Sequence, residues 1–183
     1  MTTILAIQYP DRVIFGTDSR ISDSSGQTYS HPRTVKITQR GNYLLAVSGE
    51  VTALEIVNTV WRPPIPKGRQ WLDLYEFAIT KIIPSLKKAF TAHGYSLEKN
   101  EDGEPRFSIF ISINAEIFEI DDDFAVSMKD TNFYGIGSGS DYGIGALFAG
   151  ADIDKALEIA EINDIFTKRP FIIIEQVKKN RRV

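Results

Sequence analysis

The second residue of the chain carries the groups of a self-activating nucleophile. Cells generally remove an initiator methionine that precedes a small residue, and loss of Met1 would leave Thr2 with a free α-amine beside its hydroxyl. The amine, whose reference pKa is about 7.7–8.0, can accept the hydroxyl proton at neutral pH. Such a threonine could attack a carbonyl carbon and form a covalent intermediate. Many chains begin Met-Thr, so the interpretation depends on what the fold places beside Thr2.

A strand is expected to hold Thr2 at its tip. Residues 2–8 and 12–18 are apolar runs separated by a Pro-Asp turn, which predicts a hairpin of antiparallel strands. Beyond a polar loop, residues 34–39 and 43–48 form a second strand pair around a glycine turn. We therefore expect four strands before any helix.

Helices and further strands follow in a regular order. Apolar residues at helical spacing predict helices over residues 50–61 and 71–93, and Pro84 should kink or divide the second. We expect Ser140 or Asp141 to cap a later helix and Asp152 to cap the next. The later elements expected are strands at residues 107–113, 115–120, 124–128 and 133–136, helices at about 140–149 and 152–163, and a strand at 171–177.

This order predicts the α+β class, with two stacked antiparallel sheets and helices on their outer faces, an αββα sandwich. A chain of 183 residues is long enough for one full core and too short for two independent ones. We therefore expect residues 1–183 to form a single domain.

Composition narrows the chemistry. The chain has no cysteine and two histidines, which excludes disulfides, thiolate catalysis and a histidine-rich metal site, so no metal or cofactor is expected. The net charge of −3 gives no electrostatic reason to expect nucleic acid or an anionic membrane as a partner. No secretory signal pattern or membrane-length apolar stretch occurs, so a cytoplasmic location is expected.

A glycine-rich stretch at residues 135–140 invites a nucleotide-binding interpretation, which the sequence argues against. The chain has no Gly-x-x-x-x-Gly-Lys-[Ser/Thr] motif, and the strands before this stretch read as antiparallel rather than as part of a βαβ unit. A tight strand-to-helix turn is the simpler interpretation.

Several segments together resemble the proteasome β-type subunits of the N-terminal nucleophile hydrolases, in the style of bacterial or phage-type peptidases without a propeptide. The segments that carry the resemblance are Thr2 at the start of a strand, Gly16-Thr17-Asp18-Ser19-Arg20, Thr34-Val35-Lys36, Ile136-Gly137-Ser138-Gly139-Ser140-x-Tyr142 and Asn163-Asp164-Ile165-Phe166-Thr167. Their order matches over residues 2 to about 177. The sequence departs from the family at Thr167, where serine is usual, and at Glu50, where a small residue is expected. The resemblance implies the four-layer fold of that family and threonine-type peptidase activity.

The resemblance also implies a role for each of its site residues. Thr2 would be the nucleophile, with Lys36 stabilising its alkoxide and Asp18 pairing with the lysine. The implied set is completed by Ser138, Asp164 and Thr167 around the Thr2 amine, Gly49 as the backbone oxyanion donor, and Ile21, Thr34 and Val47 as an apolar pocket for the side chain before the cleaved bond.

Two other functions remain open from the sequence. One is a small-molecule amidohydrolase on the same scaffold, and the other is a catalytically silent, ring-forming structural subunit. The family resemblance favours a peptidase that acts on unfolded protein or peptides inside homo-oligomeric rings, where apolar residues of the first two helices, including two tryptophans, would meet a neighbouring subunit. Because the chain has no nucleotide-binding loop, a separate ATPase unfoldase would be needed for folded substrates.

Overall fold

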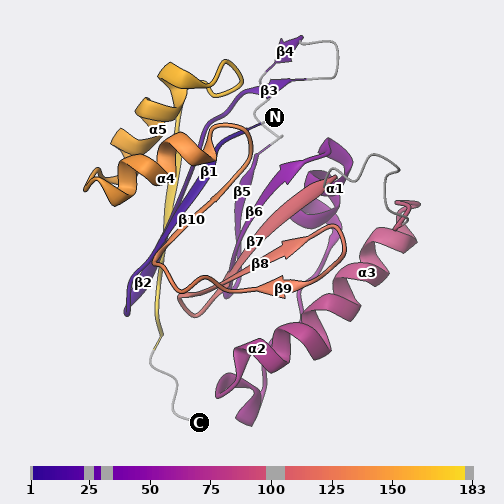
Figure 1. Cartoon of the computed structure of the whole chain (residues 1–183). Coiled ribbons are helices and arrows are strands. Elements are labelled where there is room, and N and C mark those ends of the chain that lie inside the picture. The colour runs from indigo at the N-terminus through magenta and orange to yellow at the C-terminus, as the bar shows by residue number, and fades with distance from the viewer. Residues whose placement is uncertain (1, 23–26, 30–34, 98–105, 180–183) are drawn as a thin grey trace.

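The computed structural model describes residues 2–22, 27–29, 35–97 and 106–179. Two antiparallel sheets face each other, and helices cover the outer side of each (Figure 1). The predicted α+β sandwich of four layers is therefore confirmed. The layers run from α4 (Ser140–Phe148) and α5 (Ile153–Asn163), through the two sheets, to the helices between residues 51 and 92.

The first sheet contains the predicted N-terminal hairpin and brings the end of β2 beside Thr2. Its strands, in spatial order, are β10 (Phe133–Ile136), β1 (Ile4–Gln8), β2 (Arg12–Thr17) and β11 (Ile172–Val177). In the hairpin Ile4 is paired with Thr17, so the residues before β1 lie opposite those after β2. This register places Thr2 and Thr3 at the same end of the sheet as Asp18.

The second sheet supplies the opposite wall of that end. Its strands, in spatial order, are β5 (Ile37–Arg40), β6 (Tyr43–Gly49), β7 (Phe107–Ile113), β8 (Glu116–Asp121) and β9 (Val126–Ser127). A separate ribbon is formed by β3 (Ile21–Ser22) and β4 (Thr28–Tyr29). Among the described residues, the strand predicted from residue 34 begins only at Ile37, which leaves Lys36 just before it.

The helices over the second sheet are less regular than the sequence predicts. They are α1 (Val51–Glu55) continued by the π-helical turn η1 (Ile56–Val60), the 3₁₀ turn η2 (Gly68–Trp71), α2 (Leu74–Phe77), the π-helical turn η3 (Ala78–Ile82) and α3 (Ile83–Ala92). Pro84 lies in the first turn of α3, directly after η3. The wider turn lies just before a residue that cannot donate a backbone hydrogen bond, so the helix changes its hydrogen-bond pattern near Pro84 and continues without a gap from Leu74 to Ala92.

One predicted helix cap is wrong and another is confirmed. The N-cap of α4 is Gly139, without a side-chain cap, because the Ser140 hydroxyl donates instead to the Gly137 carbonyl at 2.7 Å. The N-cap of α5 is Asp152, whose carboxylate accepts from the Lys155 amide at 2.8 Å.

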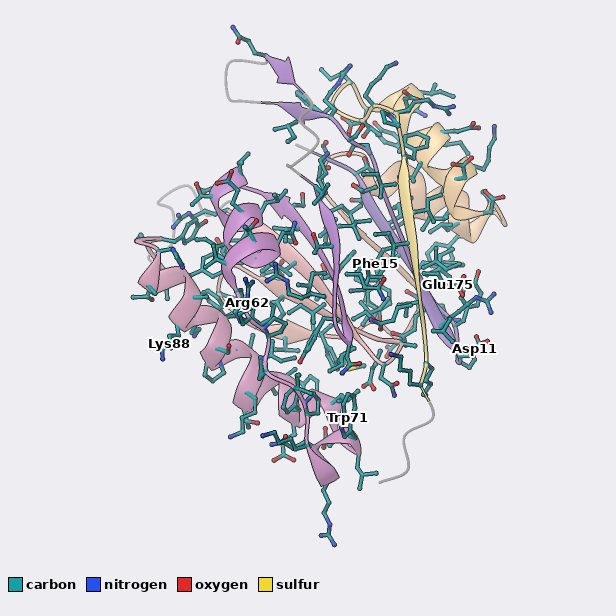
Figure 2. All side chains as sticks on the ribbon, turned by 180° about the vertical axis from the view of Figure 1, so that it is seen from behind. Asp11, Phe15, Arg62, Trp71, Lys88 and Glu175 are labelled. Atoms are coloured by element: carbon teal, nitrogen blue, oxygen red, sulfur yellow. The ribbon has the colours of Figure 1, made fainter. Side chains whose placement is uncertain are left out.

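Apolar side chains fill all three spaces between the layers. Figure 2 shows the side chains packed between the sheets, where Phe15 lies edge-on to Phe110 at 6.0 Å between ring centroids. On the helical side of the second sheet, Trp61 is 2% exposed and donates to Ser85, so this tryptophan belongs to the chain's own core. Lys88 points away from the sheet into solvent on the outer side of α3 (Figure 2). Within the described residues, none of the helices is long and apolar enough to cross a bilayer.

Candidate active site

A buried carboxylate joins the nucleophile candidate to the lysine. Asp18 is fully buried after β2, and its Oδ1 accepts from the Thr2 hydroxyl at 2.7 Å and from the Thr3 amide at 3.0 Å. The same oxygen lies 2.6 Å from Lys36 Nζ. Since Asp18 directly follows β2 of the first sheet and Lys36 directly precedes β5 of the second, this ion pair connects the two sheets at Thr2.

Backbone amides hold the other oxygen of this carboxylate. Asp18 Oδ2 accepts from the amides of Arg20 at 2.9 Å and Lys168 at 3.3 Å. With both oxygens accepting hydrogen bonds, the carboxylate has a fixed orientation toward Lys36. The Ser19 amide also donates to the Lys168 carbonyl at 3.1 Å, which ties the segment after α5 to the end of β2.

Lys36 is held where its charge is costly. Its side chain is 4% exposed, and burial lowers the pKa of Lys36 below its ordinary value of 10.5, against the opposing effects of Asp18 and Asp164. An ammonium in such a place needs the opposite charge that Asp18 supplies. The Lys36 ammonium is therefore held against the same carboxylate oxygen that accepts from the Thr2 hydroxyl.

A second cluster, made of one carboxylate and two hydroxyl side chains, lies beside Thr2 and Thr3. Asp164 Oδ2 accepts from Ser138 Oγ at 2.8 Å and from Thr167 Oγ1 at 2.6 Å. Ser138 Oγ also lies 3.4 Å from the Thr2 carbonyl oxygen, and Thr167 Oγ1 lies 2.5 Å from Thr3 Oγ1. The structure thus brings together all six residues that the family resemblance implies for catalysis.

The glycine-rich stretch is shaped by its close approach to these residues. Gly137 has a φ of +93°, and a Cβ there would lie 2.1 Å from the Thr2 carbonyl oxygen. A Cβ on Gly139 would lie 2.1 Å from Thr3 Oγ1 and 2.8 Å from Thr167 Oγ1. Glycine is needed at both positions because the backbone itself packs against Thr2 and Thr3. The predicted strand-to-helix turn is correct, and its glycines make room for the site.

A small pocket opens beside Thr2. It has a volume of about 30 Å³, which holds little more than one water molecule. Its lining is formed by Thr2, Ile21, Lys36, Val47, Ser48, Gly49, Val51 and Leu54. Two of the three predicted pocket residues and the predicted oxyanion glycine therefore border the same space as the nucleophile candidate. The third predicted pocket residue, Thr34, lies outside the described residues.

The turn at Gly49 also requires glycine. Gly49 ends β6 with a φ of +107°, and a Cβ there would lie 2.3 Å from the Arg106 carbonyl oxygen. This backbone conformation turns the chain sharply between β6 and α1, at the edge of the pocket. A backbone amide at this position is a suitable oxyanion donor.

Sequence reasoning missed Thr3 and the contacts made by backbone amides. Thr3 is fully buried, and its carbonyl accepts from Thr17 Oγ1 at 2.9 Å while its hydroxyl meets Thr167. A signal was present, because adjacent residues of a strand point to opposite faces and the predicted sandwich covers both faces of this sheet. The amides of Arg20 and Lys168 carry no side-chain signal and could not have been found from residue types. In the described part of the chain, no group of three or more acidic or histidine side chains could hold a metal ion.

Solved structures with this fold are numerous, although sequence comparison finds nothing. No protein-family model matches the chain, and none of the curated proteins does either. The structure is similar to that of BPH from Thiobacillus denitrificans in complex with epoxomicin, with a TM-score of 0.72 and 20% identity over 97% of this chain and 100% of that one. It is similar to eukaryotic HslV from Trypanosoma brucei, with a TM-score of 0.62 and 18% identity over 94% and 98% of the chains. It is also similar to Anbu (ancestral beta-subunit) from Yersinia bercovieri, with a TM-score of 0.65 and 13% identity over 96% and 81% of the chains. The chain therefore has the N-terminal nucleophile hydrolase fold of the proteasome type.

Proposed function

We propose that the protein, once Met1 is removed, is a threonine-type peptidase with Thr2 as its nucleophile. The observation that carries the proposal is the contact of one buried carboxylate with both the Thr2 hydroxyl, at 2.7 Å, and the Lys36 ammonium, at 2.6 Å. Neither a core threonine nor a solvated lysine needs this arrangement, because burying an ion pair is rarely a gain in stability.

In the proposed mechanism, Thr2 Oγ1 attacks the carbonyl carbon of a peptide bond. The hydroxyl proton passes to the Thr2 amine, directly or through one water molecule, while the positive charge of Lys36 stabilises the forming alkoxide. The carbonyl electron pair moves onto oxygen, where the Gly49 amide donates to the oxyanion. The protonated amine then gives its proton to the leaving nitrogen, and an ester links the substrate to Thr2.

The second half of the reaction uses the same groups with water. The amine removes a proton from a water molecule that attacks the ester, and Thr2 leaves with that proton. Asp164, Ser138 and Thr167 form a bonded group beside the Thr2 backbone, and we propose that they orient the amine in both halves. The Ser138 hydroxyl lies 3.4 Å from the Thr2 carbonyl oxygen, which connects this group to the nucleophile's backbone.

We propose that the side chain before the cleaved bond is apolar. Ile21 and Val47 border the pocket, and the charged lining residue Lys36 is already paired with Asp18. Model peptides ending in Leu should be cleaved faster than those ending in Arg or Glu at equal concentration. A strong preference for Arg or Glu would contradict this pocket assignment.

We also propose homo-oligomeric rings that enclose the site, served by a separate ATPase unfoldase. A nucleophile that hydrolyses unfolded chains is safe only inside a chamber, and apolar side chains of the outer helical layer support a subunit contact there: Leu72 is 69% exposed, and Tyr75 and Ile79 are each nearly half exposed. Sedimentation at micromolar concentration tests this assembly. A stable monomer that still cleaves unfolded protein would contradict it.

The test of the function compares Met1-free wild type, confirmed by intact mass, with Thr2→Ala. Hydrolysis of peptides and of an unfolded protein should occur in the wild type and be lost in the variant. Activity that persists in Thr2→Ala would refute the mechanism. Activity on small amides alone would favour an amidohydrolase, and a Met1-free protein that forms rings without any hydrolysis would favour a structural subunit.

A further inference from the structure

Glu50 occupies a position between two residues of the pocket but turns its side chain away from it. Gly49 and Val51 both border the pocket beside Thr2. The Glu50 carboxylate instead meets Arg106, with Oε1 at 3.0 Å from Nε and Oε2 at 3.3 Å from Nη2. This geometry is bidentate, the form in which arginine fixes a carboxylate most firmly.

Arg106 is itself held from three sides. Its guanidinium lies 4.2 Å from the centroid of the Tyr95 ring, and its Nη1 donates to the Ser96 carbonyl at 2.8 Å. Its backbone amide donates to Asp122 Oδ2 at 3.0 Å. The Arg106 side chain is 13% exposed against 43% for Glu50, so arginine is the anchored partner.

Glu50 and Arg106 are also joined through their backbones. The Glu50 amide donates to the Arg106 carbonyl at 2.9 Å. That carbonyl oxygen is the atom that would lie 2.3 Å from a Cβ on Gly49, so the turn at Gly49 rests against it. Residue 50 is thus fixed through its amide and through its carboxylate, immediately after Gly49, which borders the pocket.

We propose that Glu50 and Arg106 are positioning residues that hold the Gly49 amide in its place as oxyanion donor. The inference rests on the proposed peptidase function and adds to it a pair of residues that never touch the substrate. An oxyanion donor contributes most when its position is fixed before the charge develops. The ion pair supplies that rigidity at an exposed turn whose glycine would otherwise leave it free to move.

The pair also removes a harmful charge. An unpaired carboxylate one residue from the oxyanion donor would oppose the negative charge that forms there. The hydrogen bond from Arg106 lowers the pKa of Glu50, so the carboxylate is ionised at neutral pH and needs its partner. Removing arginine alone should therefore be worse than removing glutamate alone.

The test separates binding of the ground state from binding of a tetrahedral adduct. A peptide aldehyde forms such an adduct when Thr2 Oγ1 bonds to its carbon, the hydroxyl proton passes to the amine and the carbonyl oxygen becomes the oxyanion. Glu50→Gln should weaken inhibition by the aldehyde and lower kcat, each by about tenfold, while KM for the matched peptide changes less than about twofold. The control is Glu55→Gln, which changes the same residue type at an exposed position of α1, the helix that begins directly after Glu50.

Arg106→Met supplies a second variant, and thermal unfolding shows whether each variant is folded. The aldehyde affinity of Arg106→Met should fall further than that of Glu50→Gln, and the double variant with both changes should recover part of the loss. Equal aldehyde affinities for Glu50→Gln and Glu55→Gln would overturn the inference while leaving the peptidase intact. A rise in KM as large as the loss of aldehyde affinity would do the same. A wild type without Thr2-dependent hydrolysis would overturn the proposed function and this inference together.

Discussion

Two buried polar clusters join the same two sheets, and only one of them has the composition of a catalytic site. At the Thr2 end, Asp18 and Lys36 bridge the sheets through a charged pair at 2.6 Å. Farther along the first sheet, Gln176 of β11 bridges them through neutral bonds, accepting from Ser112 Oγ at 2.9 Å and from the Ala115 amide at 3.1 Å. Gln176 pairs with Val13, which is five residues before Asp18 or roughly 17 Å along a strand.

The difference shows what distinguishes a site from a structural bridge. Gln176 uses its amide oxygen and its amide nitrogen, the latter donating to the Asn42 carbonyl at 3.1 Å, so both ends of the side chain are satisfied without charge. The Asp18–Lys36 pair carries a desolvation cost that a neutral bridge avoids, and it holds a hydroxyl with it. The Asp18–Lys36 pair is costly to bury, and a neutral bridge would join the sheets without that cost, which supports a role for the pair in the proposed chemistry.

Replacing Lys36 should give the largest effect, and it should distinguish the charged cluster from the neutral one because both stability and activity are lost. Lys36→Met leaves the Asp18 charge buried without its partner, which should cost about 3–5 kcal/mol of unfolding free energy and reduce kcat by at least about 1000-fold. Adding Asp18→Asn should recover stability and leave activity lost. Chemical denaturation and peptide hydrolysis measure the two quantities. Activity within tenfold of wild type in Lys36→Met would show that the charged pair is a bridge like Gln176.

Gly137→Ala should damage the site by position alone, since no charge changes. Its new Cβ would lie 2.1 Å from the Thr2 carbonyl oxygen in a conformation with φ of +93°. We expect a loss of about 2–4 kcal/mol in stability and, because Thr2 must shift, about 100-fold in kcat. Gly145→Ala in α4 is the control, because nothing lies within 4 Å of its Cβ position. Equal kcat values for the two variants would contradict the close packing of the glycine stretch on Thr2.

Gln176→Ala should affect stability without affecting chemistry. Loss of its bonds leaves the Ala115 amide and the Ser112 hydroxyl buried without this partner, at an expected cost of about 1–3 kcal/mol. The kcat of the folded variant should stay within about twofold of wild type. Glu175→Ala, an exposed change on the same strand (Figure 2), is the control for stability. A large drop in kcat would mean that the two bridges are coupled.

The pH dependence of the charged cluster should have opposite signs for stability and activity. Burial lowers the pKa of Lys36 from 10.5, so between the lowered value and 10.5 the unfolded chain binds more protons than the folded one. The contribution of Lys36 to unfolding free energy therefore rises with pH across that window, while kcat falls as the ammonium is lost. Lys36→Arg should shift the fall in kcat to higher pH. An alkaline limb unchanged in Lys36→Arg would assign it to another group.

The sequence predicts the sheets well because clear turn signals separate the strands, as between β1 and β2 and directly after β7. It predicts the site residues through family resemblance, and the fold then places Asp164 and Ser138 beside Thr2 although they are distant in sequence. It fails where no residue type marks the geometry. The π-helical turns η1 and η3 leave no periodic signal, and the Ser140 cap was wrong because its hydroxyl bonds backward to Gly137.

Long-range partners set the other limit. Glu50 could be noticed only as a departure from the family, because Arg106 lies 56 residues away and nothing in either neighbourhood predicts their contact. The backbone amides that orient Asp18 are equally hidden, since an amide is present at almost every residue.

The most direct test of the central claim is to find which atom reacts. Met1-free protein is treated with a peptidyl vinyl sulfone, and the modified residue is mapped by mass spectrometry of the digested chain. We predict one equivalent of label on Thr2, complete loss of hydrolysis in the labelled protein, and no label in Thr2→Ala. Label on Lys36 or on any other residue with loss of hydrolysis, or full hydrolysis by protein labelled at Thr2, would contradict the account.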